Sequence, residues 1–227
     1  MSSNKRNGEM QTVLVTGGRI RLGAHIAQHL EAQGWTVLRH SSTAEPGFLH
    51  ADFGNEAAVS RFAEQLPPLD CVIHNAGVLW RDRQGKELIQ QINRLTPLAL
   101  ARLVRGSGMQ LFIGDADPTH DPDFSSYSAS KIMLRKEIPA LAAALIPRWR
   151  VHLLEINGVL RAPTESIEHF EGLRSQAPLG GITLDDITDT IDFLLRSKRL
   201  TGQIISLDGG AGARNGQKRN PRRPGVD

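Results

Sequence analysis

The sequence predicts a doubly wound α/β domain, in which one parallel sheet carries helices on both faces. Short apolar runs alternate with longer segments of helical periodicity, which is typical of βαβ units joined by right-handed crossovers. A glycine-rich turn lies between the first apolar run and the first helical segment. No internal repeat or linker interrupts this pattern. We therefore expect one domain over residues 12–212, a flexible leader over 1–11 and a disordered basic tail over 213–227.

The expected strands are short runs rich in Val, Ile, Leu and Phe, which favour a pleated, buried surface. They cover residues 12–17, 36–40, 47–52, 71–76, 110–115, 151–157 and 203–209.

The expected helices have apolar residues at the spacing of one helix face. They cover residues 22–34, 56–66, 86–104, 126–146 and 184–197. The link between Arg39 and His50 is short and contains Glu45-Pro46-Gly47. We therefore expect no full helix between the second and third strands.

Composition excludes several classes of protein. No apolar stretch is long enough to span a bilayer, and the polar N-terminal residues do not resemble a secretory signal. Cys71 is the single cysteine, which rules out an internal disulfide and a multi-cysteine metal site, and we expect a cytoplasmic location. We expect no metal.

The positive charge is concentrated in the tail. The net charge is +3, but residues 213–227 hold five basic residues and one acid, or +4, which leaves −1 for the rest. The tail lacks interleaved aromatic residues, so a nucleic-acid partner is not expected.

The turn after the first strand reads TGGRIRLG. Glycines at such a turn let the backbone approach a phosphate, and the helix that follows presents its amide groups. The alternative is a tight structural turn. The candidate cofactor-binding residues here are Gly17, Arg19, Ile20, Arg21, Leu22 and Gly23.

The second strand ends without the acid that binds the ribose 2′-OH of NAD. It offers instead a guanidinium, an imidazole and two hydroxyls, which suit a 2′-phosphate and favour NADPH. The alternative is a solvated loop. These candidates are Arg39, His40, Ser41 and Ser42.

Tyr127 and Lys131 are four residues apart in the segment SYSASK. On a helix this spacing places both side chains on one face. A neighbouring ammonium would lower the pKa of the phenol and make it a usable acid. A bare YxxxK pattern also occurs on ordinary surface helices.

The motifs together resemble the short-chain dehydrogenase/reductase family, which has a Rossmann fold. They are TGxxxxxG in the first turn, HNAG at 74–77, Asn93 four residues before Pro97, YxxxK, and LDGG at 207–210, in that order. The resemblance covers about residues 12–212.

The resemblance implies roles for several residues. Tyr127 would donate the proton, Lys131 would hold the nicotinamide ribose, and Asn93 would support a proton-relay water. The remaining cofactor contacts implied are Asn75, Ala76 and Gly77 on the ribose side, and Asp52 and Phe53 at the adenine.

Two departures from the common family pattern point to a subfamily. Asp115 stands where most members have a serine, twelve residues before Tyr127, and Arg21 stands where most have Gly or Ala. Both features are similar to the pteridine reductases, and the SLDGG ending and the short link after the second strand are similar to the bacterial dihydromonapterin reductases.

This resemblance implies a pterin substrate bound by Asp115 and Arg21, with Tyr127 nearby. Leu79 occupies the position at which related enzymes place a stacking aromatic, and Trp80 is an alternative wall for the substrate. Residues 161–182 are the expected substrate lid.

We therefore expect an NADPH-dependent reductase of a pterin C=N bond, with Asp115 assisting the Tyr127–Lys131 pair and with possible dihydrofolate side activity. The family resemblance implies a homotetramer. Alternatives are a carbonyl or 3-oxoacyl reductase, a non-catalytic cofactor-binding regulator, and a nucleic-acid-binding role of the tail.

Overall fold

A seven-stranded sheet forms the centre of the molecule. The computed structural model describes residues 5–6, 9–119, 121–161 and 166–213. Within these residues the strand order is β5-β4-β3-β6-β7-β8-β9, and every neighbouring pair is parallel. This order confirms the doubly wound α/β fold expected from the sequence. The chain reverses its direction of winding between β3 and β6, the two strands from which the sheet grows outward.

All seven expected strands are present, with ends that differ by a few residues. They are β3 (Thr12–Val15), β4 (Thr36–Ser41), β5 (Leu49–His50), β6 (Leu69–His74), β7 (Gly106–Asp115), β8 (Trp149–Ile156) and β9 (Gln203–Leu207).

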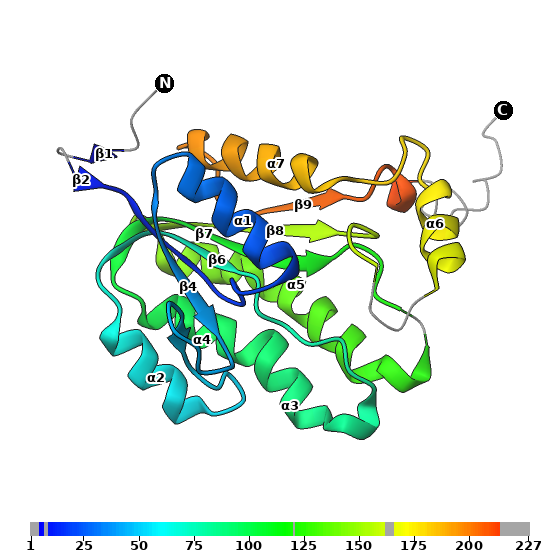
Figure 1. Ribbon diagram of the computed structural model, residues 1–227, viewed down its shortest axis with the longest axis horizontal. Helices are drawn as coiled ribbons and strands as arrows, with labels where there is room; N and C mark the ends of the chain where they lie inside the picture. The colour runs from blue at the N-terminus through cyan, green and yellow to red at the C-terminus, as the bar shows by residue number, and fades with distance from the viewer. Residues whose placement is uncertain (1–4, 7–8, 120, 162–165, 214–227) are drawn as a thin grey trace, which may run out of the picture.

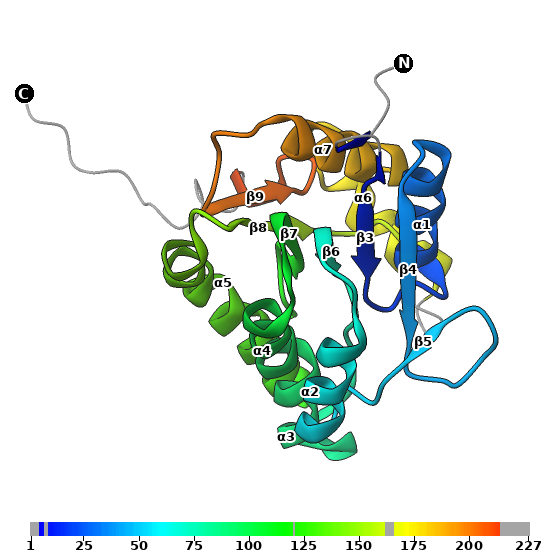
Figure 2. The same ribbon diagram turned by 90° about the vertical axis from the view of Figure 1, so that its left-hand side faces the viewer.

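The helices lie in two layers, one on each face of the sheet (Figures 1 and 2). Helices α1 and α7 cover one face, and α2, α3, α4 and α5 cover the other. Their bounds are α1 (Arg21–Ala32), α2 (Glu56–Gln65), α3 (Lys86–Gln90), α4 (Thr96–Leu103), α5 (Ser125–Leu145) and α7 (Leu184–Arg196).

Side chains that alternate along the central strands pack into two separate hydrophobic cores, one on each face of the sheet. Val13 and Val15 of β3 pack with Ile26 of α1, whereas Leu14 between them packs with the α2, α4 and α5 side. Successive side chains on a strand point to opposite faces, so a strand buried on both sides has an almost continuous apolar run. That is the pattern from which these strands were predicted.

The single helix expected over 86–104 is divided into three parts. Between α3 and α4, residues Gln91–Leu95 form one π-helical turn, η2. A π turn widens the backbone locally and is frequent at functional sites. Here it contains Asn93, which is 2% exposed.

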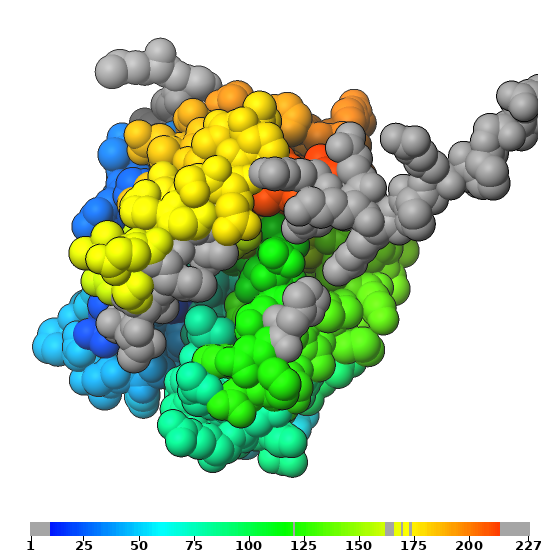
Figure 3. All heavy atoms as spheres, turned by 90° about the vertical axis from the view of Figure 1, so that its right-hand side faces the viewer, coloured from blue at the N-terminus to red at the C-terminus, as the bar shows by residue number. Residues whose placement is uncertain are grey.

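The connecting segments and the N-terminal leader can be compared with the prediction in the same way. The segment between β4 and β5 contains no helix, as its length predicted. Part of the expected lid forms a helix, α6 (Ile167–Ser175), at the end of the molecule seen in Figure 3. In the leader, β1 (Lys5–Arg6) and β2 (Glu9–Met10) pair antiparallel. Residues 1–4, 7–8 and 162–165, and the basic tail from 214, lie outside the described part.

The described helices include none that is both long and apolar enough to cross a membrane.

Two leucines on α4 provide a matched test of the core. Leu100 is fully buried, whereas Leu103 on the same helix is 46% exposed. We expect Leu100→Ala to lower the free energy of unfolding by about 2–5 kcal/mol, because it removes buried methyl groups and leaves a cavity. Leu103→Ala is the control and should cost well under half as much. Urea denaturation of both variants measures the difference, and equal losses would contradict the burial described here.

Candidate active site

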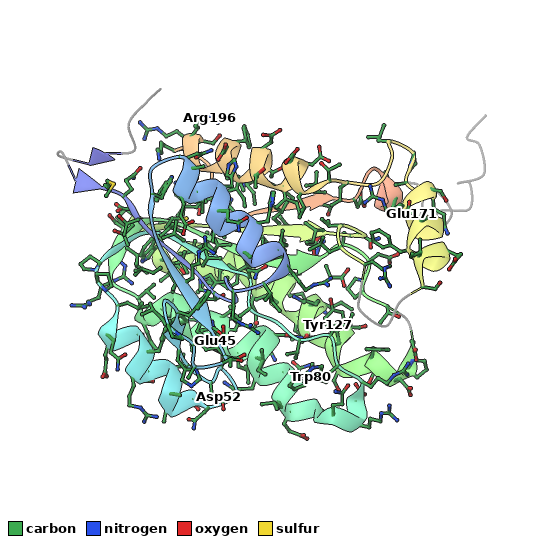
Figure 4. The ribbon with its side chains drawn as sticks, viewed as in Figure 1. Glu45, Asp52, Trp80, Tyr127, Glu171 and Arg196 are labelled. Atoms are coloured by element: carbon green, nitrogen blue, oxygen red, sulfur yellow. The ribbon has the colours of Figure 1, made fainter. Side chains whose placement is uncertain are left out.

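A large cavity opens at the carboxyl ends of the central strands. It has a volume of about 510 Å³ and lies between the turn after β3, the end of β4 and the segment after β6. In open α/β sheets this crevice, where the strand order reverses, is the usual ligand site. Figure 4 shows Glu45 and Asp52 on the β4–β5 side of this region and Trp80 and Tyr127 on the side of α3 and α5.

The glycine-rich turn is held in place by Thr16 and Asn75. The Asn75 side-chain amide donates to the carbonyl oxygens of Thr16 and Gly17, at 3.1 and 3.2 Å. The Thr16 hydroxyl oxygen accepts from the backbone N–H groups of Asn75 and Ala76. A side chain at Gly23 would place its Cβ 2.1 Å from the Gly17 carbonyl oxygen, so only glycine allows α1 to begin this close to the turn.

The start of α1 has the character of an anion site. No side chain caps its first amide groups, and its first turn contains no acid. The free N–H groups and the positive end of the helix dipole favour a negatively charged ligand here. Arg19 and Arg21 add two positive charges to the same wall of the cavity. This donor set fits the pyrophosphate of a dinucleotide.

Two arginines predicted to bind the cofactor, Arg19 in the glycine-rich turn and Arg39 at the expected 2′-phosphate site, lie in different places. Arg19 lines the cavity, and its guanidinium is 3.1 Å from Glu45 in the loop between β4 and β5. Arg39 is not among the residues that line the cavity, and it forms a two-pronged ion pair with Glu31 of α1, at 3.0 and 2.5 Å. Arg19 is therefore the better placed of the two, and both roles remain predictions.

His40 supports the glycine-rich turn by a hydrogen bond to its backbone. Its Nδ1 accepts a hydrogen bond from the Gly17 backbone N–H at 3.1 Å, and its Nε2 lies 3.0 Å from the Ala51 carbonyl oxygen. The ring also stacks on Phe53, with centroids 3.9 Å apart. Burial lowers the pKa of His40 to about 4, so the ring is neutral near pH 7. It lines the cavity as a structural support for the glycine-rich turn, and it brings no positive charge to the cavity.

Arg21 joins the turn to the segment after β8. It is the one non-glycine residue of the described chain with a left-handed backbone, at φ 54°. Its guanidinium donates to the carbonyl oxygens of Leu160, at 3.2 Å, and Arg161, at 2.9 Å. The predicted contacts of Arg21 with phosphate and substrate remain predictions, and the side chain does lie at the cavity wall where they would be made.

The remaining predicted cofactor residues gather around the same cavity. Asp52 accepts a hydrogen bond from the Gly54 N–H at 2.8 Å, which holds the turn beside Phe53. Besides the turn residues and His40, the predicted residues that line the cavity are Ser41, Ser42, Asp52, Phe53, Asn75, Ala76 and Gly77. The sequence analysis missed Gly54, Val78, Leu88 and Ile92, which also line it. The spacing of Leu88 and Ile92 indicates a shared helix face, but no local pattern shows that this face borders the cavity.

A second, smaller cavity of about 230 Å³ shares Asn75, Gly77 and Val78 with the first. Its wall brings together Asp115 from the end of β7 and Tyr127 from α5. The Tyr127 hydroxyl donates to an Asp115 carboxylate oxygen at 2.7 Å. The structure thus joins the two residues that the sequence singled out for proton transfer.

The expected effect of Lys131 on Tyr127 is not what the structure gives. Burial is the main cause that raises the pKa of the Tyr127 phenol, and the adjacent Asp115 carboxylate raises it further. The Lys131 ammonium lies 5.9 Å from the centre of the Tyr127 ring and donates to the Ile113 carbonyl oxygen at 3.3 Å. Burial lowers the pKa of Lys131, against the opposite effect of Asp115. Tyr127 is therefore a protonated donor in this structure.

Asn93 fixes the segment after β6. Its side-chain amide donates to the Val78 carbonyl oxygen and its side-chain oxygen accepts from the Val78 N–H, both at 2.8 Å. The same amide lies 3.3 Å from the Ser130 hydroxyl on α5. Asn93 therefore links the strand end to the helix that carries Tyr127. Its predicted contact with a relay water remains a prediction.

The two candidates for the stacking wall face different cavities. Leu79 lines the smaller cavity together with Tyr127, whereas Trp80 lines the larger one. The sequence analysis missed Ile113, Gly114 and Ile156, which complete the wall of the smaller cavity. Leu79 therefore shares a cavity with Tyr127 and Asp115, the predicted proton-transfer residues, and Trp80 does not.

The described part of the expected lid is anchored at its base. Arg174 of α6 donates to the carbonyl oxygens of Gly158, at 3.0 Å, and Ile182, at 2.8 Å. One side chain therefore holds both ends of this segment together. The described residues include no group of three or more His, Cys, Asp or Glu side chains that could hold a metal ion.

Known proteins of similar sequence and fold include reductases and short-chain dehydrogenases. Residues 13–145 match the model of the NAD dependent epimerase/dehydratase family. The dihydromonapterin reductase of Citrobacter koseri is 27% identical, over 87% of this chain and 95% of that protein. The crystal structure of FolM alternative dihydrofolate reductase 1 from Brucella suis in complex with NADP is 26% identical, with a TM-score of 0.80, over 89% of this chain and 95% of that one. A short chain dehydrogenase/reductase family protein is also 26% identical, with a TM-score of 0.77, over 90% and 98% of the two chains.

His40 makes the stability of the protein depend on pH. Its pKa is about 4 when folded against 6.5 in an exposed chain, so the unfolded state binds the proton more readily. The contribution is complete above pH 6.5 and is lost as the pH falls to 4, and it amounts to about 3 kcal/mol. His74 and His152, whose pKa values burial also lowers to about 4, act in the same direction.

We expect His40→Asn to reduce this dependence, because the amide oxygen can accept from Gly17 but does not titrate. Urea denaturation at a series of pH values between about 7 and 4.5 measures the slope for both proteins. A variant with the slope of the wild type would contradict a neutral, buried His40.

Proposed function

We propose that this chain, a member of the NAD dependent epimerase/dehydratase family, is an NADPH-dependent reductase of a pterin C=N bond. The resemblance to the short-chain dehydrogenases/reductases is confirmed by the similarity to a solved structure of that family. The substrate is of the dihydromonapterin or dihydrobiopterin type and the product is its tetrahydro form, with dihydrofolate as a side substrate. The hydrogen bond between Tyr127 and Asp115 in the smaller cavity is the observation that carries this proposal.

The larger cavity supports NADPH as the cofactor. It offers an uncapped helix start for the pyrophosphate, and Arg19, Ser41 and Ser42 around the position of a 2′-phosphate. The end of β4 supplies no carboxylate for a free ribose hydroxyl. The Brucella suis relative, whose structure contains NADP, supports the same choice.

The smaller cavity supports a pterin as the substrate. A pterin has an amino group and ring N–H donors, which a carboxylate accepts well. It also has a carbonyl oxygen, for which the planar donors of Arg21 are suited. A carboxylate at Asp115 would instead repel the developing alkoxide of a ketone substrate. The relatives named dihydromonapterin reductase support this reading.

NADPH, when bound, supplies a hydride to the ring carbon of the C=N bond. Tyr127 and Asp115 supply the proton to the ring nitrogen, so the bond gains one hydride and one proton and the cofactor leaves as NADP⁺. The pair holds one proton, that of the Tyr127 hydroxyl, which is hydrogen-bonded to the Asp115 carboxylate and passes to the ring nitrogen from Tyr127 directly or through Asp115. A proton from solvent then restores the pair. Lys131 and Asn93 hold the cofactor ribose and the strand end beside it.

We also propose a cytoplasmic enzyme that forms a homo-oligomer, a tetramer by family resemblance. Large apolar side chains exposed on α5, among them Ile132 and Met133, support association with further copies.

Replacement of Asp115 tests the proposed reaction. We expect the wild type to oxidise NADPH in the presence of dihydromonapterin, followed by the absorbance of NADPH. Asp115→Ser should lower kcat about 100-fold or more, because it removes the carboxylate that accepts from the Tyr127 hydroxyl and shares its proton. Asp115→Asn keeps the shape but is too weakly basic to take the Tyr127 proton and pass it on, so it should be similarly impaired. A wild type that is inert with the pterin but reduces a ketone or a 3-oxoacyl thioester would contradict the proposed substrate.

A pair of arginine variants tests the cofactor choice. Arg19→Ala should raise the KM for NADPH about 10- to 100-fold and leave that for NADH nearly unchanged, because a charge-assisted contact to the 2′-phosphate is lost. Arg39→Ala is the matched control and should have a smaller effect, since Arg39, although also paired with a glutamate, does not line the cavity. If steady-state kinetics with both cofactors show the larger increase in the KM for NADPH in Arg39→Ala, Arg39 and not Arg19 is the residue that binds the 2′-phosphate.

A further inference from the structure

The helix that carries Tyr127 begins without a cap of its own. In α5, Phe124 occupies the capping position and provides no side-chain hydrogen bond, and the first turn contains no acid. A 3₁₀ turn, Pro122–Phe124, leads directly into the helix and its Pro122 carbonyl accepts from the Ser125 N–H, which leaves the Ser126 N–H without an acceptor in the turn. The first amide groups of a helix need acceptors from elsewhere, and the positive end of its dipole favours a carboxylate. Tyr127 is the third residue of this helix, so its position depends on how the first turn is held.

Asp82 supplies the missing acceptor from a distant part of the chain. Its carboxylate accepts from the Ser126 backbone N–H at 2.9 Å and from the Ser125 hydroxyl at 2.6 Å. The Asp82 side chain is only 12% exposed, and Lys86 lies 3.7 Å from the same carboxylate. The hydrogen bond from Ser125 is the main cause that lowers the pKa of Asp82, so the acceptor stays charged near pH 7.

The same segment contains the wall of the candidate substrate cavity. Leu79, which lines the smaller cavity with Tyr127, precedes Asp82 by three residues. Arg81 pairs with Asp123 and lies 4.9 Å from the centre of the Phe124 ring, immediately before α5. The segment after β6 and the first turn of α5 are thus joined at several points, although they are more than forty residues apart in sequence.

We propose that Asp82 is a positioning residue, which caps α5 from the segment after β6 and so sets the distance between Tyr127 and the wall at Leu79. The catalytic part of this inference rests on the proposed function. The placement of Tyr127 does not, because it follows from the contacts alone. Loss of the cap would loosen the first turn of α5 and separate the Tyr127 hydroxyl from Asp115.

Asp82→Ala is the principal test, with Asp186→Ala as its matched control. Asp186 accepts from the backbone N–H and the hydroxyl of Thr183 at the start of α7, a helix that carries none of the candidate site residues. Both variants remove a carboxylate from a helix start. We expect only Asp82→Ala to lower kcat with the pterin, by about 10- to 100-fold, with little change in the KM for NADPH. Asp82→Asn keeps an oxygen for the Ser126 N–H and should restore most of the rate.

A second measurement does not depend on the reaction. Tyr127 is the only tyrosine in the chain, so the ultraviolet absorbance of the phenolate reports its ionisation alone. In the wild type and Asp186→Ala we expect no ionisation until the protein unfolds in alkali. In Asp82→Ala the phenol, freed from burial and from Asp115, should ionise nearer its usual pKa of about 10. Ser125→Ala removes one of the two contacts without weakening the helix, and it should shift in the same direction by less.

The outcomes separate this inference from the proposed function. A wild type inert with the pterin, with the Tyr127 titration changed only by the Asp82 and Ser125 variants, would overturn the proposed function and support the positioning role. An unchanged titration in Asp82→Ala would overturn the positioning role, whatever the rate. Equal losses of rate in Asp82→Ala and Asp186→Ala would also overturn it. If Asp82→Ala does not fold, Ser125→Ala and Asp82→Asn decide by the same criteria.

Discussion

The junction between Thr16 and Asn75 is the constraint on which the rest of the site depends. It ties the carboxyl ends of β3 and β6, the two strands at which the winding of the sheet reverses, through four hydrogen bonds between a hydroxyl, an amide and the backbone. The glycines at 17 and 23 have no side chain because the Asn75 amide and the Gly17 carbonyl occupy that space. The turn can therefore direct its free amide groups into the cavity, and α1 begins directly against it.

The chemistry of the two cavities differs because their charged groups are held differently. In the larger cavity, His40 is neutral and the positive charge comes from arginines at the wall. In the smaller cavity, Asp115 and Tyr127 face each other in a partly buried environment, and loss of solvation and the adjacent carboxylate keep the phenol protonated. The proposed reaction requires this arrangement, in which the cofactor site lies beside the Tyr127–Asp115 pair, because a hydride and a proton must reach adjacent atoms of one substrate.

Much of the site could be predicted because its residues follow strand ends, and parallel strands end at one edge of the sheet. That rule is enough to place Gly17, Ser41, Asn75 and Asp115 at the same edge. It could not predict which charged groups are already engaged. Arg39 is paired with Glu31, and Arg21 reaches the carbonyl oxygens of Leu160 and Arg161, through contacts between segments that no local pattern connects.

The sequence by itself determined the seven strands, their order of appearance, the missing helix after β4, and the placement of Tyr127 and Lys131 on one helix face. These follow from periodicity and spacing, which act over a few residues. The tertiary structure alone decided that His40 is a neutral support, that the pKa of Tyr127 is raised and not lowered, and that Asp82 caps α5. Burial and long-range hydrogen bonds set these properties, and both exist only after segments distant in sequence have packed together.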